Sequence, residues 1–198
     1  FFGPAAGTAV AGALVGAGGT AAALSAETRP TVATAAGDVD IDLNQAVPYF
    51  DQPHQAGIST TPQRHAVYAT FTLADAATKT DLQTLLARWT AAIGQLTQGK
   101  TIGQVEPVRP DAVGGDTGEA YGLFPASLTV TVGLGPGVFT DRFGLASFRP
   151  NALAELPRMP GDFLEPGLTG GDLSVQACAD DPQVAYHAVH NLARMAAT

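Results

Sequence analysis

The chain has 198 residues, of which 45% are hydrophobic and 14% are charged. This composition is typical of a globular protein and excludes disorder along the whole length. The 10 basic and 18 acidic residues give a formal charge of −8, and no basic cluster contains interleaved aromatic residues. We therefore expect no nucleic acid as a partner.

The amino-terminal segment predicts export. Residues 1–26 carry no charged side chain and are rich in glycine and alanine. Small residues then offer cleavage points at Leu24-Ser25-Ala26 and at Ala33-Thr34-Ala35. The glycines disfavour a stable membrane-spanning helix, so a spanning anchor is the lesser alternative. We expect an export signal with its cleavage region at residues 1–36, and no stable membrane span.

This segment resembles the signals of the twin-arginine export route, in which two arginines precede a pair such as Phe-Phe. Phe1 and Phe2 fit that pair, although the arginines themselves are not in this sequence. The predicted destination is the periplasm, the cell surface or the exterior. Residues 37–48 show little periodicity, which predicts a flexible tether leading into a folded domain at residues 49–198.

A first strand is predicted from His65 to Leu73. Val67, Ala69 and Phe71 alternate with polar residues there, so one face of the strand should be in the core.

A helix is predicted after this strand. Thr80-Asp81-Leu82-Gln83 has the pattern of a capping box, and Gly99 suits a left-handed C-terminal cap. Between them runs an apolar stripe at helical spacing, Leu82, Leu85, Leu86, Trp89, Ile93 and Leu96. Trp89 is therefore expected in the core.

The middle of the chain alternates loops with one strand. Residues 100–121 are rich in Gly, Asp and Pro, which predicts a long surface loop. Alternation over residues 128–134 predicts a second strand that ends at Gly135-Pro136-Gly137. Prolines within residues 139–160 favour a short helical turn and an irregular connection.

The last two elements are a strand and a helix. Leu173, Val175 and Ala177 alternate with more polar residues up to Cys178, which predicts a half-buried strand. Asp181-Pro182 then supplies an N-cap and a proline at the first helical position. The apolar stripe of this helix is Val184, Ala188, Leu192 and Met195.

The element order predicts an α+β fold, the ferredoxin-like βαββαβ pattern without its last strand. That fold orders its sheet 4-1-3-2, so the strand at residues 65–73 would be an unpaired edge. We expect the sequence to be the amino-terminal part of a larger protein. The alternative is that a strand from residues 1–48 fills the vacant position.

Site signals in the residues themselves are weak. His187 and His190 have a permitted metal-ligand spacing, but no third ligand can be named and we predict no metal site. Asp181 serves better as a helix cap than as half of a catalytic pair with Asp180. Cys178, the one cysteine, is expected to be a packing residue.

Two further motifs carry no recognisable chemistry. The segment Pro53-His54-Gln55-Ala56-Gly57-Ile58 predicts a turn whose side chains satisfy nearby backbone groups. The run Gly133-Leu134-Gly135-Pro136-Gly137 lacks the lysine and Ser/Thr of a phosphate loop.

Together these segments resemble the dye-decolorising peroxidase family, particularly its exported bacterial members. The likeness is carried, in order, by residues 53–58 with Thr60, Thr61 and Gln63, by 123–133, by Phe143-Gly144-Leu145 with Arg149-Pro150, by Leu156-Pro157 and Pro160-Gly161-Asp162, and by 170–187.

The resemblance implies a haem peroxidase of the dimeric α+β barrel type, built from two ferredoxin-like halves. A proximal histidine would hold haem b, and hydrogen peroxide would be cleaved before dyes, phenols or other small reductants are oxidised. The partners implied are the carboxy-terminal remainder of the same protein, hydrogen peroxide and those reductants. Association between copies of the protein is a further expectation.

The family's catalytic residues are not found in this sequence. Its distal aspartate belongs to a Gly-x-x-Asp-Gly motif that the proximal histidine and a distal arginine follow, and the run at residues 114–118 does not fit it. Peroxide cleavage needs an iron ligand, an acid/base and a cation. We therefore assign no catalytic residue, leave the cofactor-binding residues unknown, and expect an inactive scaffold that forms one wall of a haem pocket.

Two other functions remain open. The runner-up is a free-standing exported ferredoxin-like binding or assembly module without catalysis, which would dimerise through its edge strand. A weaker third alternative is an exported protein that binds metal through His187 and His190. An in-frame Gly-x-x-Asp-Gly downstream of Thr198 would favour the enzyme.

Overall fold

A computed structural model describes residues 41–50, 53–109, 111–154, 157–165, 167 and 169–197. These residues belong to one compact unit. The predicted export signal at residues 1–36 lies outside the described residues. Within the described part, no helix is both long enough and apolar enough to cross a membrane.

The secondary structure follows the predicted order. The elements are β1 (His65–Phe71), α1 (Lys79–Leu96), β2 (Thr129–Leu134), the 3-10 turns η1 (Pro136–Val138), η2 (Asp141–Phe143) and η3 (Ala146–Phe148), β3 (Leu173–Ala179) and α2 (Pro182–Ala196). The three 3-10 turns account for the predicted helical turn in the connection, where Phe143 is buried in the core.

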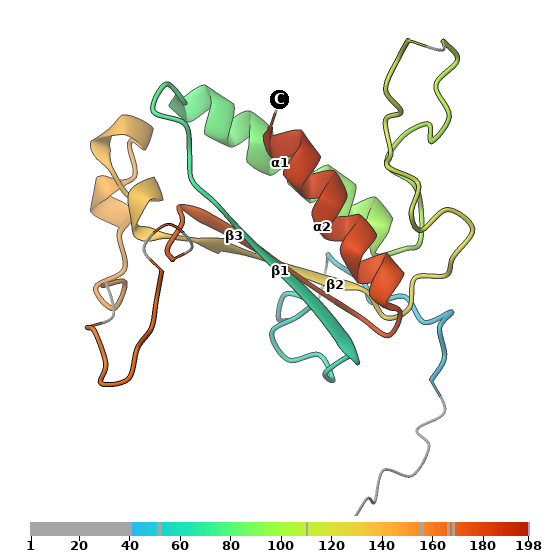
Figure 1. Ribbon diagram of the computed structural model, residues 1–198, viewed down its shortest axis with the longest axis horizontal. Coiled ribbons are helices and arrows are strands. Elements are labelled where there is room, and N and C mark those ends of the chain that lie inside the picture. Colours follow the sequence, from blue (N-terminus) through green and yellow to red (C-terminus); the bar gives the residue numbers. More distant parts are fainter. Residues whose placement is uncertain are drawn as a thin grey trace, which may run out of the picture. The chain divides into compact units, whose positions relative to one another are not determined.

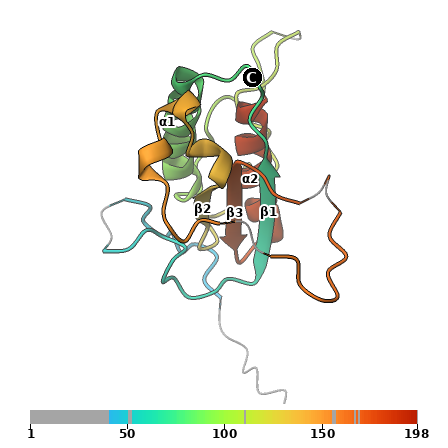
Figure 2. The same cartoon turned by 90° about the vertical axis from the view of Figure 1, so that its left-hand side faces the viewer.

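The described strands form one antiparallel sheet in the order β1-β3-β2. Figure 2 shows β3 between the other two strands. This is the predicted sheet order 4-1-3-2 without strand 4, so the α+β ferredoxin-like half is confirmed. Among the described residues β1 pairs with β3 alone, and it is an edge strand as expected.

Both helices lie on the same side of the sheet (Figure 1). Leu173, Val175 and Ala177 of β3 point to that side and are at most 1% exposed. Gln176 points to the opposite side and is exposed. The strand alternation predicted from the sequence is confirmed, and Cys178 is a half-buried free thiol on the side away from the helices.

The segment that precedes β1 covers part of that opposite face. Gln63 donates through Nε2 to the carbonyl of Ser127 (2.7 Å) and to Oγ1 of Thr129 (3.2 Å). A Cβ atom on Gly57 would lie 2.4 Å from Oγ1 of Thr131, so only glycine fits this close approach to β2. Thr129 is therefore only 2% exposed although it points away from the helices.

The start of α1 differs from the prediction. Thr78, not Thr80, is the N-cap, and its capping box is closed by Asp81. Asp81 accepts a hydrogen bond from the backbone N–H of Thr78 (2.8 Å), while Oγ1 of Thr78 accepts from the N–H of Asp81 (3.3 Å). In Thr78-Lys79-Thr80-Asp81 the threonine and its partner are three residues apart, as in the box predicted at residues 80–83. A charged carboxylate is in addition favoured at a helix N-terminus.

The end of β1 also differs from the prediction, because the strand stops at Phe71 instead of Leu73. Asp172 N–H donates to the carbonyl of Phe71 (2.8 Å), and the Asp172 carboxylate accepts from the N–H of Leu73 (2.7 Å). A side chain thus replaces the strand partner at Leu73.

Trp89 joins the two helices in the core. It is 1% exposed, and its Nε1–H donates to the carbonyl of Leu192 (2.9 Å). Its ring lies 5.5 Å from that of Phe71. The predicted core position is confirmed, as are the left-handed Gly99 after α1 (φ 70°) and the Asp181 N-cap of α2.

Residues 41–48, the described part of the predicted tether, contact the domain. The carbonyls of Leu43 and Gln45 accept hydrogen bonds from the N–H groups of Ala126 (2.8 Å) and Ser127 (2.7 Å). No strand forms in this part. The rest of the segment considered for the vacant strand position lies outside the described residues.

Candidate functional site

A polar cluster of the described residues joins α2 to the loop at residues 114–119. Five α2 side chains share one stripe at helical spacing, and each of them hydrogen-bonds to this loop: Gln183, His187, His190, Asn191 and Arg194. The segment predicted as a surface loop is therefore anchored against the core by α2.

A buried histidine and a buried aspartate form the centre of the cluster. His187 and Asp116 are 4% and 2% exposed, and His187 Nε2 lies 2.7 Å from Oδ1 of Asp116. The carboxylate also accepts from the backbone N–H groups of Ile102 (2.9 Å) and Gly118 (2.8 Å). Gly118 has φ 82°, a left-handed conformation that favours glycine.

These contacts determine the charge of Asp116. Burial opposes ionisation, but the hydrogen bonds from His187 and the two backbone N–H groups outweigh burial and lower the pKa of Asp116 below its ordinary value. Asp116 is therefore an ionised acceptor at neutral pH. In neutral His187 the proton is then on Nε2, and Nδ1 carries the lone pair.

Two neighbours fix the loop backbone around this pair. Asn191, which is fully buried, donates to Oγ1 of Thr117 (2.7 Å) and accepts from the N–H of Thr117 (3.2 Å). Arg194 donates to the carbonyls of Gly114 and Gly115, each at 2.6 Å. A Cβ on Gly114 would lie 2.4 Å from the carbonyl oxygen of Val105, so this packing requires glycine.

The second histidine lies in a different environment. His190 is exposed, and its Nδ1 is 2.5 Å from Oε1 of Glu119. Burial acts against ionisation of Glu119, yet hydrogen bonds from Thr117 and His190 lower its pKa overall. This pair is a surface ion pair when His190 is protonated, and such pairs contribute little to stability.

The two histidines do not form a shared ligand pair in the structure. Each imidazole has its own carboxylate, Asp116 for His187 and Glu119 for His190. No group of three or more His, Cys, Asp or Glu side chains gathers in a metal-binding arrangement anywhere in the described part of the chain.

The other motifs that the sequence singled out have structural contacts. Residues 53–58 include the predicted turn, closed by the Ile58 N–H donating to the Gln55 carbonyl (3.1 Å). The Gln55 side chain, however, donates to the hydroxyl of Tyr49 (3.3 Å) instead of a backbone group, and His54 is exposed. Asp181 caps α2, while Asp180 accepts from the N–H of Arg64 (3.2 Å).

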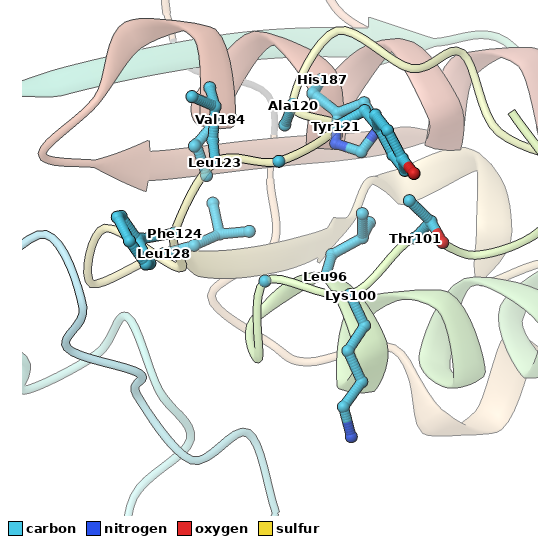
Figure 3. A pocket seen from close by; sticks show the side chains of 12 residues that line it. Leu96, Lys100, Thr101, Ala120, Tyr121, Leu123, Phe124, Leu128, Val184 and His187 are labelled. Atoms are coloured by element: carbon cyan, nitrogen blue, oxygen red, sulfur yellow. The ribbon is translucent and has the colours of Figure 1, made fainter.

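A cavity of about 350 Å³ lies beside His187 (Figure 3). It lies between the C-terminal end of α1, the segment at residues 120–124 and α2. Sequence reasoning missed both the cavity and the Asp116–His187 pair. The available signal was the polar stripe on α2, which matches the spacing of the apolar stripe used to predict the helix.

Comparison with known proteins places this fold in a family. Residues 55–198 match the family profile described as Dyp-type peroxidase, N-terminal. Curated proteins named Deferrochelatase from Yersinia pestis and Escherichia coli (strain K12) are 35% and 32% identical over 184 residues. The match covers 92% of this chain but only 40% and 42% of those relatives.

Solved structures give the same result. A DyP-type peroxidase from Streptomyces coelicolor superposes with a TM-score of 0.67 at 36% identity, over 78% of this chain and 38% of the other. One from Cellulomonas bogoriensis gives 0.66 at 35% identity, over 78% and 39%. The chain therefore belongs to the Dyp-type peroxidase family, in which it corresponds to the amino-terminal domain.

Proposed function

We propose that this chain is the amino-terminal part of a haem peroxidase that reduces hydrogen peroxide and oxidises dyes, phenols or similar donors. The observation that carries the proposal is the family match over residues 55–198 together with the ferredoxin-like half that these residues form. The chain spans about two fifths of the length of the curated relatives it matches. We therefore propose the peroxidase activity for the whole protein and not for this chain by itself.

We assign none of the histidines of this chain as an axial ligand to haem iron. His54, His65 and His190 are exposed, so this chain alone does not enclose a haem on any of them. His187 has its Nε2 on Asp116, which leaves Nδ1. Nδ1 is bonded to the ring carbon that joins the side chain to α2, so a group bound there would have to lie close to the backbone of that helix.

We therefore assign the iron ligand to residues outside this chain, in the carboxy-terminal part, and give this chain a scaffold role. The edge strand β1 supports that assignment, because among the described residues it pairs on one side only, and its other side offers backbone donors and acceptors to a further strand. The face of β3 that carries Ser174 and Gln176 is only partly covered, and it provides a surface for one wall of the haem pocket.

We further propose that the protein is exported. The support is the uncharged Gly/Ala-rich segment at residues 1–26 with its small-residue cleavage points. The intact mass of the native product, isolated from fractionated cells, tests this proposal. An uncleaved product confined to the cytoplasm would refute it.

The peroxidase proposal is tested on the complete gene product that contains this chain. The protein is purified, reconstituted with haem and assayed for peroxide-dependent oxidation of a phenol and a dye. We expect a Soret band and turnover that requires both peroxide and haem. A complete product that takes up haem but shows no peroxide-dependent oxidation, or takes up none, would contradict the proposal.

A further inference from the structure

The cavity beside His187 has the size and the walls of a small-molecule site. Its volume of about 350 Å³ lies at the lower end of the range for ligand pockets. Its walls are mainly aliphatic and come from separate parts of the chain: Leu96 from α1, Leu123 and Leu128 from the segment leading into β2, and Val184 from α2. In Figure 3 these side chains surround a common space.

One hydrogen-bonding group with a defined direction lies on the wall of this cavity. The imidazole of His187 lines it, and Asp116 occupies Nε2 at 2.7 Å. Within the described part of the chain, Nδ1 has no hydrogen-bond partner. In neutral His187 this atom is an acceptor, because the ionised Asp116 keeps the proton on Nε2.

The cavity also has exposed aromatic rings on its wall, and its lining favours a flat, neutral ligand. Tyr121 and Phe124 line the cavity and are 72% and 58% exposed, so both rings are free to stack on an aromatic molecule. Lys100 also borders it, but its side chain extends away from the other lining residues in Figure 3, and Nζ donates to Oε1 of Gln98 (2.8 Å). The ammonium group is therefore not directed at an anionic ligand.

We propose that this cavity binds a small neutral phenol, whose hydroxyl donates a hydrogen bond to Nδ1 of His187 while its ring lies among the aliphatic walls. The proposal rests on the proposed function in one respect, because phenols are among the donors that the peroxidase would oxidise. The cavity and its contacts are formed by residues of this chain alone. The proposal therefore places a donor-binding site in the amino-terminal domain.

The test uses the complete gene product, treated with haem, with ¹³C-labelled Leu and Val methyl groups. The probes are 4-fluorophenol and fluorobenzene, which differ in the hydroxyl group. Shifts of the Leu123, Leu128 and Val184 methyl resonances report on this cavity and not on other binding sites. Because the methyl readout needs neither haem nor turnover, absence of a Soret band would refute the proposed function, while the methyl shifts would still decide the cavity proposal.

Three variants separate the roles of the residues. His187→Gln keeps a donor for Asp116 but removes the acceptor at the Nδ1 position. His190→Gln is the matched control, since His190 lies one turn away on α2 and does not line the cavity. Thr101→Trp fills the cavity from a residue outside the Asp116–His187 pair.

We expect 4-fluorophenol to shift the three methyl resonances, and fluorobenzene to bind about tenfold more weakly, as the loss of one hydrogen bond predicts. His187→Gln should weaken 4-fluorophenol binding by a similar factor, His190→Gln should leave it unchanged, and Thr101→Trp should abolish it. Equal affinity for the two probes, or unchanged binding in folded His187→Gln, overturns the proposal. If His187→Gln does not fold, unchanged shifts in Thr101→Trp overturn it.

Discussion

At the residue scale, the Asp116–His187 pair is a polar contact between two buried side chains. Asp116→Asn keeps the shape of the side chain but removes the charge, and it leaves His187 buried without its carboxylate. We expect a loss of about 1–3 kcal/mol in the free energy of unfolding, measured by denaturant titration. Glu119→Gln is the control, because its partner His190 is exposed, and it should change stability by less than about 1 kcal/mol. Equal effects of the two variants would contradict the importance of burial.

The pKa of Asp116 also predicts the response to acid. Its pKa is lowered in the folded protein, so its stabilising contribution is present at pH values above its unfolded pKa and is lost as the pH falls through the folded pKa. Below about pH 4 the free energy of unfolding should therefore fall less steeply in Asp116→Asn than in the unaltered protein. Chemical unfolding at a series of pH values measures both slopes, and parallel slopes would show that Asp116 does not contribute.

Sequence reasoning at this scale found the histidines but not their partners. His187 and His190 stood out by their spacing, whereas Asp116 and Glu119 lie about 70 residues earlier in a segment that resembled a solvent-exposed loop. No local pattern links a loop carboxylate to a distant helix. The glycines at positions 114 and 115 suggested a turn, but their close backbone packing is a tertiary property.

At the element scale, the capping box at the start of α1 gives a direct comparison. Thr78→Ala removes the N-cap and should lower the free energy of unfolding by about 1 kcal/mol. Thr80→Ala replaces an exposed residue inside the helix by a better helix former, so it should be neutral or slightly stabilising. Thermal denaturation of both variants measures this difference. A larger loss of stability in Thr80→Ala than in Thr78→Ala would show instead that Thr80 is the N-cap, as the sequence first predicted.

Periodicity predicted the strands and helices well, and their ends less well. Alternation identified β1 and β3, and helical spacing identified α1 and α2, because each element buries one face against the same core. The exact end of a strand and the burial of its outward-facing residues depended on contacts from elsewhere in the chain. β1 ends where Asp172 replaces a strand partner, and Thr129 of β2 is buried because Gln63 covers it.

At the scale of the whole molecule, the order of the elements predicted the sheet, and the family motifs predicted the relationship to Dyp-type peroxidases. Haem-binding residues could not be assigned from the sequence, because the Gly-x-x-Asp-Gly motif of the family, with the histidine and arginine that follow it, is not found in these 198 residues. In the structure, His187 uses Nε2 for its contact with Asp116, and the other three histidines are exposed.

The most direct measurement is a parallel haem titration of this 198-residue chain and of the complete gene product, followed by absorbance and by peroxide-dependent turnover. We expect a Soret band and turnover for the complete product, and neither for the 198-residue chain, because we place the iron ligand in the carboxy-terminal part of the protein. A stoichiometric Soret band with peroxidase turnover from the 198-residue chain alone would contradict it.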